Sequence, residues 1–334
     1  ALWPTLHVLN TWRNQQVAGD RLLVVANPMA FGARLANEAW GLPLDSAYTA
    51  APMLRTSLPP MTLAQWSLPS GVPQWLPRLA WVALDRYKLQ PLVLTALNEL
   101  RVVLGLPELS DSVFGRWMHA PQGGLTLFPA WFAGLAPDWP VQVRQGDFPL
   151  FDEAAPLDPG LLAFLDAGDP PVVVMPGTGQ MHGAALFRAV ARALPAMRMR
   201  GVLLGPVPVE VASLVQSSAL WCGSYQSFAQ LLPRARALVH HAGVGSSAQA
   251  LRAGTPQLLW PQAYDQFDNA WRLEQLGVAG RLASGLPDAD GLARGLAALL
   301  ESDASARARF VAQEFFSKSD SGLERMCSQL EKWA

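Results

Sequence analysis

The chain has 334 residues, of which 51% are hydrophobic and 15% charged, so it is long enough for two domains and too apolar to be disordered. Its 25 basic and 26 acidic residues nearly cancel, which excludes a nucleic-acid partner, and two cysteines favour a cytoplasmic protein without a disulfide framework or a zinc site. No apolar run reaches the roughly 20 residues that a membrane-spanning helix needs.

The first half of the chain predicts one strand–helix–strand unit and little further regular structure. Strands are expected at 21–26, 43–44 and 124–128, and helices at about 29–40 and 94–104. Prolines and tryptophans interrupt this pattern over residues 51–90. A doubly wound domain begins with a strand, but this chain opens with an amphipathic segment around Leu6, Leu9 and Trp12. We therefore expect the first domain to lack an N-terminal portion of roughly half a domain.

The second half alternates short apolar runs with helical patterns, as in a doubly wound parallel sheet. Strands are expected at 171–175, 201–205, 237–240 and 257–260, and helices at about 187–194, 246–253 and 269–276. The stretch rich in proline and aspartate at 147–159 predicts a linker, so we expect domains at 1–150 and 151–334. In such sheets, ligands bind at the carboxyl ends of the strands, where the strand order reverses.

The strongest motif for chemistry follows the strand predicted at 237–240. It reads His240-His241-Ala242-Gly243-Val244-Gly245-Ser246-Ser247 and opens a helix. Glycines let the backbone approach a ligand, the helix N-terminus offers unpaired N–H groups, and hydroxyls and imidazoles add donors. These features predict a diphosphate site. The alternative is a capped Gly-Ser turn with structural histidines, and two histidines at the strand end make it the weaker interpretation.

Three further motifs add weaker signals. Asp265-Gln266 follows the next predicted strand and suits sugar hydroxyls, since the carboxylate accepts hydrogen bonds and the amide both donates and accepts them. Asp268 is expected to cap the helix that starts at Asn269. Thr178 lies in a glycine turn after the strand at 171–175, and Tyr225 could stack on a flat base or be an ordinary tyrosine.

The order and spacing of these motifs resemble the donor signature of the GT-B glycosyltransferases of the UDP-glycosyltransferase superfamily. The residues that carry the resemblance are 241–246, 252–257 and 265–266. Segments 117–123, 128–133 and 148–152 resemble the rhamnosyltransferases of rhamnolipid synthesis. The resemblance implies an α/β fold of two Rossmann-like doubly wound domains facing a cleft, the first of them incomplete. Residues 1–150 would bind the acceptor and residues 151–334 the nucleotide sugar.

The resemblance also implies roles for individual residues around the donor. The diphosphate would contact Thr178, Gly243, Gly245, Ser246 and His241, with His240 as the alternative to His241. The base and ribose would contact Tyr225, Gln226 and Gln249. The sugar would contact Asp265 and Gln266. Gln249 stands where many members place a ribose-binding glutamate. Asn27 stands where many members carry an aspartate that orients the catalytic histidine. That histidine belongs to the part of the first domain expected to be missing, so no catalytic base is predicted.

The implied reaction moves L-rhamnose from dTDP-L-rhamnose to a lipid-like hydroxy acid, a hydroxyalkanoyloxy-alkanoate, with inversion and without a metal or cofactor. An acceptor groove would involve Trp66, Trp75, Trp117 and His119, although most aromatic residues of the chain must be ordinary core. An exposed apolar rim would permit peripheral contact with the inner membrane, but no basic amphipathic helix is predicted. The competing interpretations are a UDP-sugar transferase for another hydrophobic acceptor, a non-catalytic nucleotide-sugar-binding protein, and an epimerase of the same fold.

Overall fold

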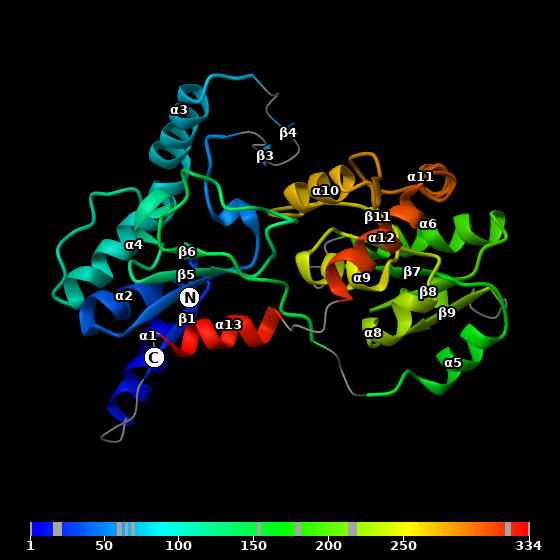
Figure 1. The fold of residues 1–334 in the computed structure, drawn as a ribbon, viewed down its shortest axis with the longest axis horizontal. Helices are drawn as coiled ribbons and strands as arrows, with labels where there is room; N and C mark the ends of the chain where they lie inside the picture. Colours follow the sequence, from blue (N-terminus) through cyan, green and yellow to red (C-terminus); the bar gives the residue numbers. More distant parts are fainter. Residues whose placement is uncertain are drawn as a thin grey trace. The chain divides into compact units, whose positions relative to one another are not determined.

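The chain divides into two compact units (Figure 1). One consists of Ala1–Pro149 with Ser321–Ala334, and the other of Leu150–Asp320. The computed structural model describes residues 2–15, 22–58, 62–63, 66–67, 71–151, 155–177, 182–212, 219–317 and 322–332. Residues 321–334, expected with the second domain, pack instead with the first unit.

The first unit contains a four-stranded parallel sheet with the strand order β1-β2-β5-β6. Its strands are β1 (Val24–Ala26), β2 (Leu44–Tyr48), β5 (Gly123–Thr126) and β6 (Val143–Arg144), beside a two-stranded antiparallel pair of β3 (Thr62–Leu63) and β4 (Trp66–Ser67). Its helices are α1 (Leu2–Gln15), α2 (Phe31–Trp40), α3 (Trp75–Leu84), α4 (Gln90–Val103) and α13 (Gly322–Glu331). The predicted strand–helix–strand unit is confirmed.

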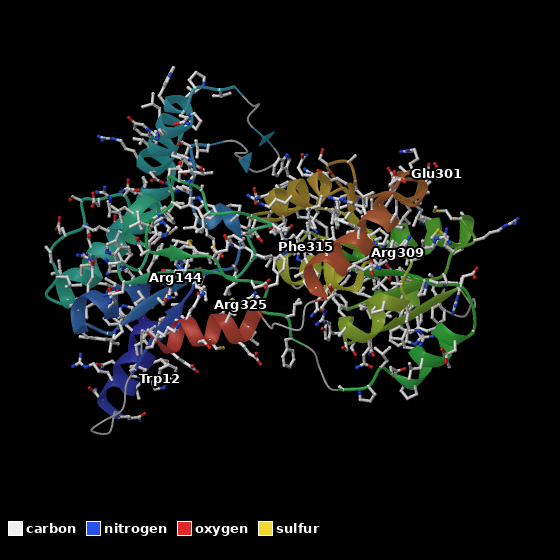
Figure 2. The ribbon with its side chains drawn as sticks, in the orientation of Figure 1. Trp12, Arg144, Glu301, Arg309, Phe315 and Arg325 are labelled. Carbon is white, nitrogen blue, oxygen red and sulfur yellow. The ribbon has the colours of Figure 1, made fainter. Side chains whose placement is uncertain are left out.

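The core of the first unit lies where three helices meet. Leu9 of α1, Leu35 of α2 and Leu97 of α4 are buried in one apolar cluster. The amphipathic opening segment is thus a helix with its apolar side inward, whereas Trp12 is 54% exposed (Figure 2). A π-helical turn at Asp85–Leu89 joins α3 to α4. This turn and α3 occupy the proline-rich stretch in which the sequence predicted no pattern.

The second unit is built on a six-stranded parallel sheet with the order β12-β11-β10-β7-β8-β9. Its strands are β7 (Val172–Met175), β8 (Gly201–Leu204), β9 (Leu220–Gly223), β10 (Ala237–His240), β11 (Gln257–Leu259) and β12 (Ala279–Arg281). Its helices are α5 (Pro159–Asp166), α6 (Gly183–Ala196), α7 (Val209–Ala212), α8 (Phe228–Leu231), α9 (Val244–Ala253), α10 (Gln266–Gln275), α11 (Ala289–Glu301) and α12 (Ala304–Phe316). The strand order reverses between β7 and β10, as in a Rossmann fold.

Helices cover both faces of this sheet because successive strand residues point to opposite sides. Val172 and Val174 of β7 belong to the core beneath α6 and α11, whereas Val173 belongs to the core with α5, α8 and α9. The four strands predicted in this half are confirmed. Strands β9 and β12 were not predicted; they lie at the two edges of the sheet, and most of their residues are only half-buried.

Candidate functional site

The carboxyl ends of β7 and β10 meet at the reversal of strand order in the second unit. The two strands are paired in parallel, with Met175 opposite His240. Gly177 follows β7 and His241 follows β10, so the two loops leave neighbouring strands at the same edge of the sheet. In doubly wound sheets, this is the position at which ligands bind.

The imidazole of His241 packs against the backbones of two glycines. A Cβ atom at Gly177 would lie 2.4 Å from Nδ1 of the ring, and one at Gly243 would lie 2.4 Å from Nε2. Gly177 also has a φ of +98°, which side chains of L residues rarely adopt. The ring can therefore occupy this place only because both neighbours lack a side chain.

His241 carries a buried polar atom at the edge of the sheet. Its Nδ1 is buried and has no hydrogen-bond partner among the described residues. Burial lowers the pKa of His241, and the nearby carboxylate of Asp265 partly opposes that shift. The imidazole is consequently neutral at pH 7, and one ring nitrogen can donate while the other accepts.

His240 is a core residue. Its side chain is fully buried, and its Nε2 lies 2.9 Å from Oε1 of Gln257 on the neighbouring strand β11. Burial, more than the neighbouring His241, lowers the pKa of His240 to about 3. Full burial and the contact with Gln257 favour a structural role for His240, and its alternative assignment to the diphosphate stays a prediction.

Helix α9 begins at the glycine-rich turn, as the motif predicts. Gly243 is its N-cap, and the helix starts at Val244, two residues before the predicted start at Ser246. Gly245 is exposed and Ser246 half-buried, so the first turn reaches the surface. Ser247 is buried and its hydroxyl donates to the carbonyl of Gly243 at 2.9 Å. The free N–H groups of this first turn form a potential anion site.

Asn269 connects the two predicted donor motifs. Its Nδ2 donates to the carbonyl of Ala242 at 3.0 Å and to Oδ2 of Asp265 at 2.8 Å. Ala242 has a φ of +64°, a strained backbone for a residue with a side chain. From the sequence, Asn269 was expected only as the start of a helix. The signal that could have found it is the spacing of four residues from Asp265, which puts both on one helix face.

Helix α10 begins earlier than predicted, and this corrects one assignment. Its first residue is Gln266 and Asp265 takes the N-cap position, although its carboxylate makes no capping hydrogen bond. Asp268, predicted as the N-cap, lies inside the first turn and pairs with Arg272, whose Nε is 2.6 Å from Oδ2. Burial raises the pKa of Asp265, and the hydrogen bond from Asn269 opposes the rise.

Gln266 shapes the loop that precedes its helix. Its Oε1 accepts hydrogen bonds from the backbone N–H groups of Gln262 and Ala263, at 2.8 and 3.1 Å. These bonds close the loop between β11 and α10 and hold Asp265 at its position. The carboxamide oxygen is occupied within the chain, which leaves the amide nitrogen as the group of Gln266 that can meet a sugar hydroxyl.

The residues expected at the base lie in a separate loop after β9. Tyr225 is 50% exposed, and its ring centroid is 5.6 Å from that of Phe228. Gln226 accepts a hydrogen bond from the backbone N–H of Asp158 at 2.9 Å. An exposed aromatic face is therefore present at this position, while the carboxamide oxygen of Gln226 is used to fix the loop.

Gln249 on α9 uses both ends of its side chain within the chain. Its Nε2 donates to the carbonyl of Phe151 at 3.0 Å, and its Oε1 accepts from Arg252 at 2.8 Å. Contact with a ribose would require one of these bonds to open. Thr178, expected at the phosphates, lies outside the described residues.

The acceptor residues expected from the sequence separate into different environments. Trp117 is buried and its Nε1 donates to Glu38 at 3.1 Å, so it belongs to the core of the first unit. His119 is also buried, with Nδ1 2.9 Å from the hydroxyl of Tyr48, and burial lowers its pKa to about 4. Both side chains lie in the interior of the first unit, so a role for either in acceptor binding stays a prediction. Trp75 is 60% exposed, whereas the Trp66 side chain lies outside the described residues.

Within the ranges given above, no group of three or more His, Cys, Asp or Glu side chains is arranged to hold a metal ion. No helix in the described part of the chain combines the length and the apolar character needed to cross a membrane.

Comparison with solved structures identifies the fold. A glycosyltransferase of kitacinnamycin aligns with a TM-score of 0.69 at 17% identity, over 98% of this chain and 80% of its own. The spinosyn rhamnosyltransferase SpnG complexed with thymidine diphosphate aligns with a TM-score of 0.63 at 18% identity, over 98% of this chain and 76% of its own. The chain therefore has the α/β fold of the GT-B glycosyltransferases.

Sequence comparisons point to the same class. The vancomycin aglycone glucosyltransferase of Amycolatopsis orientalis is 35% identical over 225 residues, 65% of this chain and 52% of the relative. The O-mycaminosyltylonolide 6-deoxyallosyltransferase of Streptomyces fradiae is 30% identical over 246 residues, 71% of this chain and 56% of the relative. Residues 223–321 match the family described as erythromycin biosynthesis protein CIII-like, C-terminal domain. The chain spans about half the length of these curated relatives.

Proposed function

We propose that the protein is a glycosyltransferase that moves L-rhamnose from dTDP-L-rhamnose to a hydroxyalkanoyloxy-alkanoate lipid, the mono-rhamnolipid reaction. The assignment of the nucleotide-sugar donor is supported by the position of His241, which lies between Gly177 and Gly243 at the reversal of strand order. The relatives are sugar transferases, and a structural neighbour that shares the fold is a rhamnosyltransferase with bound thymidine diphosphate. The lipid half rests on the resemblance of segments 117–123, 128–133 and 148–152.

In this proposal, the diphosphate lies at the first turn of α9. The N–H groups of that turn and the neutral imidazole of His241 donate hydrogen bonds to phosphate oxygens. These donors stabilise the charge that develops on the leaving diphosphate, and this requires no metal ion. Asp265 and the amide nitrogen of Gln266 lie at the sugar hydroxyls, at the adjacent strand end. Tyr225 stacks on the base.

A second candidate is transfer of a sugar to another hydrophobic acceptor. The relatives favour it, because one is named for a vancomycin aglycone. A further relative, 26% identical over 275 residues, is the sterol 3-beta-glucosyltransferase UGT80A2 of Arabidopsis thaliana. Both candidates share the donor geometry and differ only in the acceptor and in the nucleotide, dTDP or UDP. A comparison of turnover with dTDP-L-rhamnose and UDP-glucose on the lipid acid and on a sterol separates them.

The donor site is tested with His241→Ala and Asp265→Ala. We expect His241→Ala to weaken dTDP binding by about tenfold, the loss of one hydrogen bond to a charged group, measured by calorimetry. Asp265→Ala should leave dTDP affinity nearly unchanged and lower rhamnose transfer, measured by mass spectrometry of the product, by at least about tenfold. Asp290→Ala removes an exposed carboxylate of α11 and serves as the control.

Two results would contradict this assignment. If Asp265→Ala abolishes dTDP binding, the carboxylate is not a sugar contact. If the wild-type chain turns over UDP-glucose and never dTDP-L-rhamnose, the proposed donor is wrong.

A further inference from the structure

The first unit contains a pocket of about 520 Å³ that the donor site does not use. It lies between the start of α4, the preceding helix α3 and the segment around Ser57. Its lining includes Arg55, Arg78, Trp81, Arg86, Arg116 and Asp138. Among the described residues that line it, four are arginines and three are aspartates, so the wall carries one net positive charge.

The charge of Arg55 is already neutralised inside the protein. Its NH1 lies 2.5 Å from Oδ2 of the buried Asp85, which also accepts from the hydroxyl of Ser112 at 2.5 Å. The Arg55 guanidinium lies 4.7 Å from the ring centroid of Trp81. In this arrangement, the charge of Arg55 is balanced by Asp85 and requires no ligand.

Asp138 and Asp111 are likewise engaged. Asp138 accepts hydrogen bonds from the Thr56 hydroxyl at 2.8 Å and from the N–H and hydroxyl of Ser57 at 2.6 and 2.8 Å. These neutral donors lower the pKa of Asp138 although burial opposes them, so the carboxylate stays ionised. Asp111 lies 3.7 Å from the exposed guanidinium of Arg116. Neither carboxylate pairs with the two arginines that remain.

Those two arginines, Arg78 and Arg86, line the pocket from consecutive helical segments. Toward the described part of the chain, Arg78 donates only through Nε, to the Ser57 hydroxyl at 3.3 Å, and Arg86 forms no hydrogen bond or ion pair there. Both side chains are exposed. Trp81 and Val82 provide apolar surface between them, with Val82 61% exposed. Guanidinium groups with free N–H donors beside an apolar wall suit a carboxylate attached to a hydrocarbon chain.

We propose that this pocket binds the carboxylate end of an acidic, lipid-like acceptor. Arg78 and Arg86 hold the carboxylate, and Trp81 and Val82 contact the adjoining methylene groups. The single net positive charge of the lining matches one carboxylate better than a phosphate dianion. This inference rests on the proposed function, because it assigns a place to one part of the proposed acceptor.

The test compares an acid with its neutral ester. Calorimetry with 3-hydroxydecanoate and its methyl ester, below their aggregation concentrations, measures how much of the affinity depends on the carboxylate. We expect Arg78→Gln/Arg86→Gln to weaken binding of the acid by at least about tenfold and to leave the ester unchanged. The control is Lys88→Gln, which removes an exposed charge two residues after Arg86 and outside the pocket lining. It should not change the affinity for the acid.

Three outcomes would overturn the proposal. The acid and the ester could bind wild-type protein equally, Lys88→Gln could lose as much affinity as the double variant, or inorganic phosphate could displace the acid. Thermal unfolding of each variant shows whether the first unit is still folded. Arg55 and Asp85 are not substituted, because breaking their buried pair would destabilise the unit.

A transfer assay separates this inference from the proposed function. If wild-type protein transfers rhamnose and the double variant keeps the same KM for the acid, the pocket assignment is wrong while the function stands. If the acid binds through Arg78 and Arg86 but no sugar is transferred to it, the function is wrong while the pocket stands.

Discussion

The absence of two side chains decides where the imidazole of His241 lies. Gly177 comes from the loop after β7 and Gly243 from the loop after β10, so residues far apart in sequence clear the space for one ring. Each glycine alone would be read as an ordinary turn residue. That both glycines contact the same imidazole follows only from the parallel pairing of β7 and β10, which brings the two loops together.

Gly177→Ala and Gly243→Ala should each displace the His241 ring. A new Cβ atom would lie 2.4 Å from a ring nitrogen at either position, so the imidazole must rotate away. We expect dTDP affinity to fall by about tenfold, as for loss of the imidazole itself, and Gly177→Ala to lower stability as well because of its positive φ. Calorimetry and thermal unfolding measure the two effects.

The matched control is Gly280→Ala on β12. A Cβ atom there would lie no closer than 3.9 Å to the nearest side chains, so dTDP affinity should not change. Equal affinity for dTDP in all three variants would show that the ring does not contact the nucleotide.

At the scale of secondary-structure elements, α10 is tied to the turn before α9 by one buried amide. Asn269 donates to Ala242 and to Asp265, and its side chain is fully buried. Because Ala242 has a positive φ, the hydrogen bond to its carbonyl helps to hold a strained turn. The first turn of α9 and the carboxylate of Asp265 are therefore positioned together.

Asn269→Leu removes the amide nitrogen that donates both hydrogen bonds, at nearly constant side-chain volume. We expect it to lower the free energy of unfolding by about 1–3 kcal/mol, because the carbonyl of Ala242 and the carboxylate of Asp265 each lose a partner. Affinity for dTDP should fall as well, since the turn before α9 is no longer held. Chemical denaturation and calorimetry measure these quantities.

Gln275→Leu is the control for this substitution. Gln275 is an exposed amide at the other end of α10, so its replacement should change stability by less than about 0.5 kcal/mol. If Asn269→Leu behaved in the same way as Gln275→Leu, the two motifs would not be coupled through this amide.

For the molecule as a whole, the last helix is part of the first unit. Met326 of α13 is buried, and its sulfur accepts the N–H of Asp147 at 3.4 Å. Arg325 on the same helix lies 3.2 Å from Asp147, and Arg144 donates to the carbonyl of Gln329. The unit therefore depends on residues from both ends of the chain.

Met326→Ala should destabilise the first unit by about 2–5 kcal/mol, because it leaves a cavity in a buried site. The second unit should be unaffected, since Met326 belongs to the other unit. Thermal unfolding with and without dTDP distinguishes the units, because the nucleotide is expected to raise the transition of the second unit alone.

Leu323→Ala provides the comparison within α13. Leu323 is 46% exposed, so Leu323→Ala should lower the free energy of unfolding clearly less than Met326→Ala does. Equal losses in the two variants would mean that α13 does not dock through the methionine.

Much of the second unit followed from the sequence, and less of the first. The predicted strands of the second unit are runs of buried apolar residues bounded by glycine and proline, a pattern that is local and strong. In the first unit, α3 exposes most of its apolar residues and passes into α4 through a π-helical turn, so no periodic pattern marks it. Trp117 was expected at an acceptor groove because aromatic residues suit a lipid, His119 was expected with it, and the structure buries both.

The sequence by itself determined the parallel α/β class, the glycine-rich turn after β10 and the acid–amide pair after β11, because each depends on residues within one strand, turn and helix. Only the tertiary structure decided that His240 is fully buried, and that Asn269 joins the two motifs. It also gathered Arg78, Arg86 and Trp81 around one pocket. These outcomes depend on which loops the strand order makes neighbours and on which side chains the packing buries, and neither is a local property of the chain.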